Sequence, residues 1–104
     1  MQRFQFRLEV LQRLREQARE TAQLNLAAAT HMREEVTEQI VKSRNELHTL
    51  EQHMRKAAKE QSLNVDRLLD GHRHQLTLQA RLAELDQAMQ TADEEVQRCR
   101  EKLI

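Results

Sequence analysis

The chain lacks most of the residues from which β-sheets and their turns are built. Its 104 residues include no proline, no tryptophan and no tyrosine, and only one glycine and two phenylalanines. Sheet proteins need turn residues, and they need strands rich in β-branched or aromatic side chains. An all-β or an α/β fold is therefore excluded. A compact globule is excluded as well, because 11 of the 40 hydrophobic residues are alanine.

Cysteine and charge set further limits. A single cysteine cannot form an internal disulfide, which fits a reducing compartment. Seventeen basic residues balance seventeen acidic ones, so net charge does not suggest binding to nucleic acid or to an anionic membrane. No apolar run approaches the roughly 18 residues of a membrane-spanning helix, and no signal-peptide core is present. We therefore expect a soluble, cytoplasmic protein that does not insert into a membrane.

The chain is rich in residues that favour helices. Ala, Leu, Glu, Arg and Lys account for 56 of the 104 residues, a share typical of coiled coils. In the second half, apolar residues recur in alternating steps of four and three, the heptad pattern of a coiled-coil seam. This seam consists of Leu78, Leu82, Leu85, Met89, Ala92, Val96, Cys99 and Leu103.

The first half carries a second seam of the same kind. Two consecutive steps of four near Val36 predict a stutter, which would locally unwind a left-handed supercoil. This seam consists of Ala29, Met32, Val36, Ile40, Ser43, Leu47, Leu50, Met54 and Ala57. Upstream, Phe4, Leu8, Leu11, Ala18 and Ala22 continue the stripe, with Arg15 and Asn25 as polar interruptions.

Two sites compete for the break between the helices. Gly71 follows Asp70 and could end a helix. In the polar interval 59–64, Ser62 or Asn64 could cap a helix that begins at Val65. We favour the second site, because an apolar stripe through Leu68, Leu69, Leu76 and Leu82 crosses Gly71. The prediction is a single all-α domain over residues 1–104, with helices at about 3–58 and 65–103 and a turn at about 59–64.

The two helices are expected to fold back as an antiparallel coiled-coil hairpin, a long rod. Pairing outward from the turn sets Leu47 near Leu76, Ile40 near Leu82, Val36 near Leu85 and Met32 near Ala92. Leu103 then reaches only to about Thr21, so the start of the first helix has no internal partner. An exposed apolar stripe of that size usually marks an interaction site. The candidate partner-binding residues are Phe4, Phe6, Leu8, Leu11 and Leu14. Ordinary packing, in a homodimer or against the C-terminus, is the open alternative for them.

Few other residues suggest chemistry. His48 and His53 are five residues apart and His72 and His74 two apart, whereas a metal pair on a helix needs a spacing of three or four. Cys99 is expected to be a buried small hydrophobe. With no glycine-rich phosphate loop and no cleft between two helices, we expect no enzyme activity, no cofactor and no metal. An acidic block is expected to be a solvated face, with docking to a basic partner as the second interpretation. It consists of Glu84, Asp86, Asp93, Glu94 and Glu95.

The start of the chain resembles a known family. Residues 3–11 (RFQFRLEVL), followed by Arg13-Leu14-Arg15-Glu16, are similar to the opening of the flagellar FliJ family. Those proteins begin with a Phe-x-Phe-x-Leu-x-x-Leu-Leu-like run, an Arg-Glu pair and a long helix rich in Ala, Glu and Gln. The segment LNVDRLLDGH from Leu63 resembles the turn and the start of that family's second helix. The resemblance covers nearly the whole chain.

The resemblance implies a non-enzymatic part of the flagellar type III protein export apparatus, with a role in flagellum biogenesis, motility and chemotaxis. Members are antiparallel two-helix coiled coils similar to the central stalk of rotary ATPases. They insert into the export ATPase ring, contact the export gate and export chaperones, and couple the ATPase to the gate. The implied location is the cytoplasm, peripheral at the inner face of the cell membrane. Members usually run some tens of residues further, so we expect a short or truncated member.

Two other classes compete with this interpretation. One is a homodimeric coiled-coil scaffold or adaptor that joins two copies through the N-terminal apolar residues. The other is a small coiled coil associated with nucleic acid, which the balanced charge and the lack of stacking aromatics disfavour.

Overall fold

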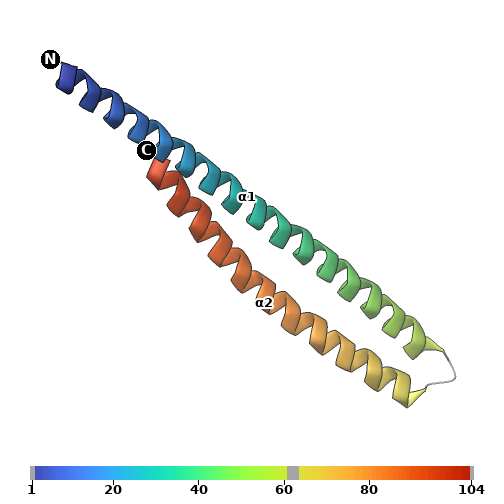
Figure 1. Cartoon of the computed structure of the whole chain (residues 1–104). Helices are drawn as coiled ribbons and strands as arrows, with labels where there is room; N and C mark the ends of the chain where they lie inside the picture. The colour runs from blue at the N-terminus through green and yellow to red at the C-terminus, as the bar shows by residue number, and fades with distance from the viewer. Residues whose placement is uncertain (1, 61–63, 104) are drawn as a thin grey trace. The chain divides into compact units, whose positions relative to one another are not determined.

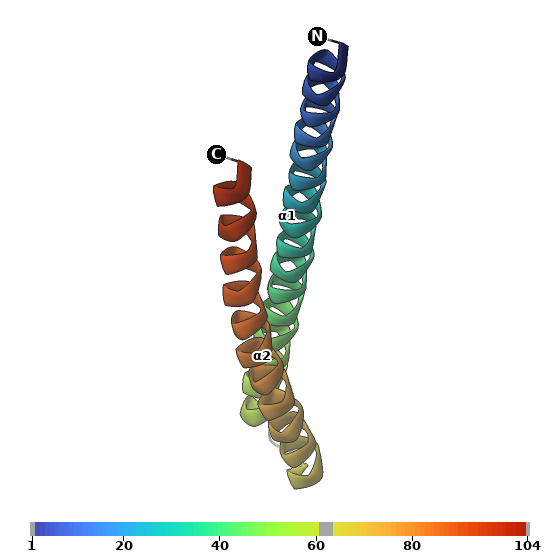
Figure 2. The ribbon, with the colours of Figure 1, turned by 60° about the vertical axis from the view of Figure 1, so that its left-hand side comes forward.

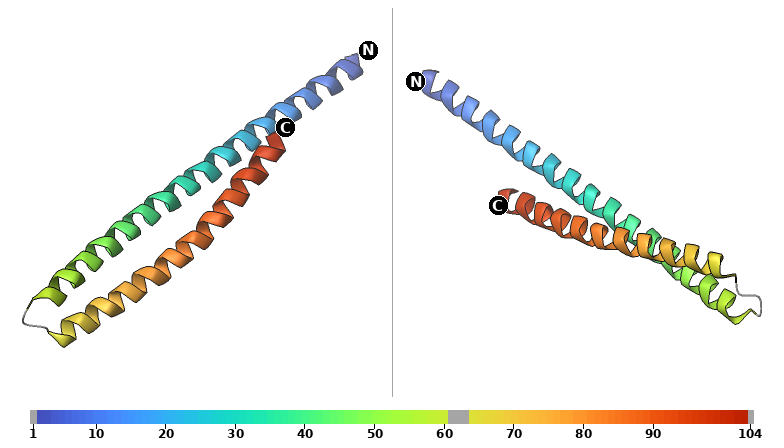
Figure 3. Two further views of the ribbon diagram at one scale, coloured as in Figure 1. Left: turned by 180° about the vertical axis from the view of Figure 1, so that it is seen from behind. Right: turned by 90° about the horizontal axis from the view of Figure 1, so that it is seen from below.

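The computed structural model consists of two helices. It describes residues 2–60 and 64–103, in which α1 spans Gln2–Lys59 and α2 spans Val65–Leu103 (Figure 1). Within those two ranges there is no strand. Each helix runs without a break when it is seen from behind and from below (Figure 3). The predicted all-α, antiparallel two-helix hairpin is confirmed.

The start of α2 is fixed by a capping residue. The side-chain Oδ1 of Asn64 accepts a hydrogen bond of 3.1 Å from the backbone N–H of Asp66. Its backbone carbonyl accepts another of 3.1 Å from the N–H of Leu68. An asparagine N-cap satisfies donors that the first turn of a helix leaves without partners, and Asp66 is favourable beside the positive end of the helix dipole. Of the two capping candidates, Asn64 therefore caps α2, while Ser62 lies outside the described residues.

The end of α1 and the interior of α2 limit where the chain can turn. Lys59, which the sequence analysis assigned to the turn, still belongs to α1, and the N–H of Glu60 donates to the carbonyl of Ala57 at 3.3 Å. Residues 61–63 of the predicted turn lie outside the described residues. Gly71 lies inside α2 and does not have a positive φ, so no helix ends there.

Tertiary contacts divide the chain into two units, and each contains a segment of both helices. The terminal unit comprises residues 1–33 and 92–104, and the hairpin unit comprises residues 34–91. A single domain over residues 1–104 stays a prediction.

Along α2, every third or fourth residue is withdrawn from solvent. All of the predicted seam residues from Leu78 to Cys99 are buried or half-buried, whereas Leu103 is exposed. The predicted stripe through Leu69 and Leu76 is wrong, because both side chains are half exposed to solvent. Their places on the seam are taken by smaller or polar residues. The observed positions are Leu68, Gly71, Gln75, Leu78, Leu82, Leu85, Met89, Ala92, Val96 and Cys99.

Along α1, the buried positions follow an unbroken heptad, and the predicted stutter near Val36 is absent. Met32 was placed on the seam but is 56% exposed, and Arg33 takes its position. A long arginine side chain can lay its aliphatic stem along the seam while its charged head stays in water. The positions withdrawn from solvent are Ala22, Leu26, Ala29, Arg33, Val36, Ile40, Ser43, Leu47, Leu50, Met54 and Ala57, with Thr30 and Glu51 half-buried beside them.

The terminal unit holds a small core and an ion pair. Ala29 of α1 packs with Val96 and Cys99 of α2, and the half-buried Leu26 covers them. One turn away along α1, the Nε of Arg33 lies 2.7 Å from the Oδ1 of Asp93. Both side chains are partly exposed, so this pair contributes little to stability. Its contribution is to the register of the two helices, since a charged residue at a seam position favours one alignment.

The hairpin unit has an equally narrow core. Ile40, Ser43 and Leu78 are its buried residues. The hydroxyl of Thr37 donates to the sulfur of Met89 over 3.7 Å. These contacts are few because each helix contributes only one narrow stripe to the interface.

The cross-helix contacts correct the predicted register. In an antiparallel pair of helices, the numbers of two facing residues add up to a constant that defines the register. In the hairpin unit this sum is 126 for Thr37 and Met89. The numbers of Arg33 and Asp93 in the terminal unit add up to 126 as well. The predicted pairs, such as Val36 with Leu85, add up to between 121 and 124. The observed pairing of α1 with α2 is thus shifted by two to five residues from the predicted one. The prediction placed Leu76 on the seam, whereas the seam residues in this part of α2 are Gly71, Gln75 and Leu78.

Leu85→Asp is expected to unfold the hairpin, whereas Glu84→Lys should change stability little. Leu85 is half-buried on the seam, where a large apolar side chain contributes about 1.5–3 kcal/mol before any charge burial is counted. Glu84 is exposed, and substitutions at such positions usually stay within about 0.5 kcal/mol. Thermal denaturation followed by circular dichroism checks both. Equal shifts in Tm for the two variants would show that the seam is wrongly assigned.

Candidate partner-binding surface

The N-terminal segment of α1, residues 2–21, is exposed along its whole length. Phe4 and Phe6 are the extreme cases, at 69% and 67% exposed. In the terminal unit this segment extends beyond the end of α2, as its blue colour shows (Figure 2). An isolated helix of this length is marginally stable in water, so contact with another surface would stabilise it. All five predicted partner-binding residues are exposed here: Phe4, Phe6, Leu8, Leu11 and Leu14.

The apolar stripe of this segment does not continue the seam that α1 forms with α2. Carried upstream from Ala22, the observed heptad would place Arg19, Arg15, Gln12, Leu8 and Gln5 on the seam, and four of those five residues are polar. The apolar residues Phe4, Leu8, Leu11, Ala18 and Ala22 instead follow a heptad in which Arg15 holds the remaining position. The two patterns meet at Ala22 in consecutive steps of four, which is a stutter, and they share positions 8, 15 and 22. The apolar stripe of the N-terminal segment is therefore offset around the helix from the continued seam.

A second exposed apolar row lies on another side of this helix. Phe6, Val10 and Leu14 follow one another in steps of four and are all exposed. Residues two apart on a helix do not face each other, so Phe6 lies on the side away from Phe4 and Leu8, and only Leu14 borders the first stripe. Five arginines and three glutamates accompany these residues in the segment, which makes it mildly basic.

The predicted acidic block is not one free face. Asp93 is engaged with Arg33 over 2.7 Å, and the Oε2 of Glu95 accepts from Arg98 at 3.0 Å. The other oxygen of Glu95 lies 3.7 Å from the sulfur of Cys99. Glu84, Asp86 and Glu94 are exposed. The block is shared between the two units, with Glu84 and Asp86 in the hairpin unit and Asp93, Glu94 and Glu95 in the terminal unit. Its partner role stays a prediction.

Histidine and cysteine are placed where the sequence suggested. All five histidines are exposed, and one of them, His48, shares a 3.2 Å hydrogen bond with Gln52. Cys99 is buried in the small core of the terminal unit. Within residues 2–60 and 64–103, no three His, Cys, Asp or Glu side chains come together as a possible metal site.

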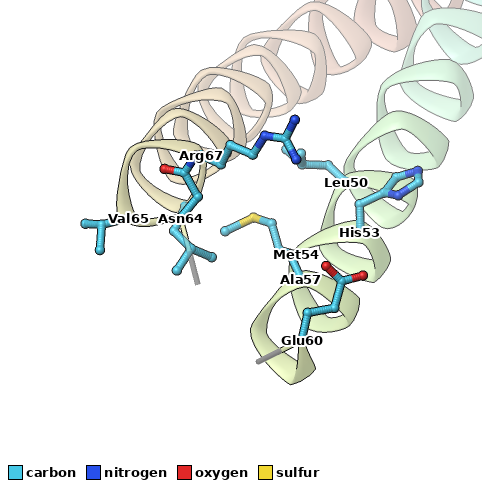
Figure 4. A pocket seen from close by; sticks show the side chains of 10 residues that line it. Leu50, His53, Met54, Ala57, Glu60, Asn64, Val65 and Arg67 are labelled. Carbon is cyan, nitrogen blue, oxygen red and sulfur yellow. The ribbon is translucent and has the colours of Figure 1, made fainter. Parts of the chain in front are cut away.

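A groove lies between the two helices in the hairpin unit, beside the start of α2. Its volume is about 690 Å³, and its lining includes Leu50, Met54 and Ala57 from α1 and Leu68 from α2. The Met54 side chain extends from α1 toward α2 across this space (Figure 4). A Cβ added to Gly71 would lie 3.3 Å from the Cγ of Met54. The glycine thus lets methionine fill the seam at this end of the hairpin unit.

Four seam residues were missed from the sequence: Leu26, Arg33, Gly71 and Gln75. Leu26 was passed over because the expected stripe runs through Asn25, which is exposed. The other three have polar or minimal side chains, which a search for apolar residues passes over. Counting back from Leu78 in steps of three and four reaches Gln75, Gly71 and Leu68, and this strict periodicity could have found them.

Comparison with known proteins adds no identification. No family model, no curated protein and no solved structure matches the chain. Among the described residues, neither helix has an apolar stretch long enough to cross a membrane.

Gly71→Ala is expected to stabilise the protein by about 0.5–1 kcal/mol and to raise Tm by a few degrees. Gly71 is a helical residue without a positive φ, where alanine has the higher helix propensity. The new Cβ requires Met54 to shift by a few tenths of an ångström, and the adjoining groove leaves room for that. Calorimetry checks the change, and a lower Tm would mean that Met54 is held rigidly in place.

Proposed function

We propose that the chain is a non-enzymatic coiled-coil component of the flagellar type III protein export apparatus. In this role it couples the export ATPase ring to the export gate and to export chaperones. It acts in the cytoplasm, peripheral at the inner face of the cell membrane. The resemblance of residues 3–16 and of the segment from Leu63 to the FliJ family is the starting point of the proposal.

The observation that carries the proposal is the exposed apolar face of the N-terminal segment. Monomeric soluble proteins rarely leave a contiguous apolar surface of this kind uncovered, and those that do usually bind a partner through it. Phe4, Leu8 and Leu11 stand at positions i, i+4 and i+7 of one helix and are all exposed. This is the spacing at which a helix inserts its anchors into an apolar groove of another protein.

The composition of the face also fits a binding role. Aromatic side chains contribute large contact areas to protein interfaces, and one of the two phenylalanines of the chain, Phe4, lies on this face. In each unit the two helices are held by a narrow seam, a form suited to transmitting a position rather than to enclosing a substrate. In this proposal the ATPase ring binds the N-terminal segment. Two further candidates for a basic gate or chaperone partner are the exposed carboxylates Glu84 and Asp86 in the hairpin unit and, separately, Glu94 in the terminal unit.

The variant Phe4→Ala/Leu8→Ala/Leu11→Ala tests the proposal. It should keep its helicity and nearly all of its Tm, because none of the three side chains is buried in the chain itself. It should lose binding to the export ATPase in a pull-down and fail to support motility.

Leu24→Ala is the matched control, since Leu24 is a large apolar residue of the same helix that is 71% exposed and lies outside the face. It should bind the ATPase and support motility as the unaltered protein does. A triple variant that melts markedly lower yet still binds would mean that the three residues are structural and that the partner surface lies elsewhere.

A further inference from the structure

The heptad of the N-terminal segment is complementary to itself when two copies run antiparallel. We propose that in the free protein this segment binds the same segment of a second copy, about a two-fold axis between Glu9 and Val10. The inference goes beyond the proposed function, because it concerns what covers this face in the absence of any other protein.

The core of the pairing follows from the spacing of the exposed residues. In antiparallel coiled coils, an a position of one helix meets a d position of the other. Leu8 then meets Leu11 of the second copy, and by symmetry Leu11 meets Leu8, which gives a centre of four leucines. All of these side chains are exposed in the single chain and hence free to be covered.

The same alignment explains the polar interruption at Arg15. Pairing Leu8 with Leu11 places Arg15 opposite Phe4 of the second copy at each end of the core. A guanidinium over an aromatic ring is a favourable cation–π contact, and the aliphatic stem of arginine adds apolar contact. Arg15 is therefore compatible with the seam of this dimer, although it interrupts the stripe in the single chain.

The flanking positions raise no like-charge conflict. Gln5 lies beside Gln12 of the second copy, and Arg7 lies beside Leu14. In a parallel dimer, by contrast, Arg15 would face Arg15, which is repulsive. An antiparallel pairing displaced by one heptad would need Ala22, which is already half-buried within its own chain. Charge and availability thus favour this alignment over both of those.

The interface is short, so the dimer is weak. It spans about two heptads, which places it among the small, transient interfaces. The mass in sedimentation equilibrium should rise with concentration from 12.4 kDa toward twice that value. The Leu8→Ala/Leu11→Ala variant should stay at the monomer mass over the same range and keep its helicity. Leu24→Ala, which removes an equally exposed leucine outside the interface, should associate as the unaltered protein does.

Disulfide trapping tests the orientation. A mixture of Gln5→Cys and Gln12→Cys proteins should form a covalent heterodimer on mild oxidation, while either protein alone should form little. The native Cys99 is buried, and the unaltered protein oxidised in parallel measures its contribution.

The proposal is overturned by a protein that stays monomeric at every concentration, or by an association that survives loss of Leu8 and Leu11. Trapping of Gln5→Cys with itself, at the yield of the mixture, would overturn the antiparallel alignment. A monomeric protein that nevertheless binds the export ATPase through Leu8 and Leu11 would refute the dimer and leave the proposed function intact.

Discussion

A single narrow seam between two helices holds this protein together. From Ala22 to Ala57 in α1 and from Leu68 to Cys99 in α2, one residue in every three or four is withdrawn from water, and no large side chain among the described residues is completely buried. The buried apolar residues are small or medium in size, so each buries a modest apolar area. The specificity of the helix pairing therefore depends on how well the side-chain shapes fit together. Arg33 with Asp93, and Gly71 beneath Met54, are the points where the two faces are matched most specifically.

The fold class could be read from the sequence because composition and period both point to the same structure. Leu78 to Cys99 follow strict heptad steps, and the structure buries or half-buries every one of them. The prediction failed at Leu26, whose place was given to the exposed Asn25, and where the seam uses residues that are not apolar. Met32 was preferred to Arg33, and Leu76 to Gln75, because hydrophobicity outweighed strict spacing in the sequence analysis. Placing Met32 on the seam instead of Arg33 predicted a stutter that is absent, and placing Leu76 there instead of Gln75 shifted the predicted register.

The exposed N-terminal segment was located from composition, since it contains both phenylalanines and a dense group of leucines. The offset of its apolar stripe from the α1–α2 seam could not be found that way. The offset depends on which side of α1 the seam occupies when it reaches Ala22. That side is known only once Arg33 is assigned to the seam. The stutter there offsets the exposed apolar stripe of the N-terminal segment from the seam that α1 forms with α2.

The central claim is that the seam supplies the stability of α1, and that residues 2–21 are helical without support from the rest of the chain. Amide hydrogen exchange of the full chain, measured residue by residue in dilute solution, tests it most directly. The account predicts slow exchange at the amides of residues 26–57 and exchange many times faster at the amides of residues 2–21. Equal protection along the whole of α1 would contradict it, because the N-terminal segment would then be stabilised by contacts that this structure does not contain.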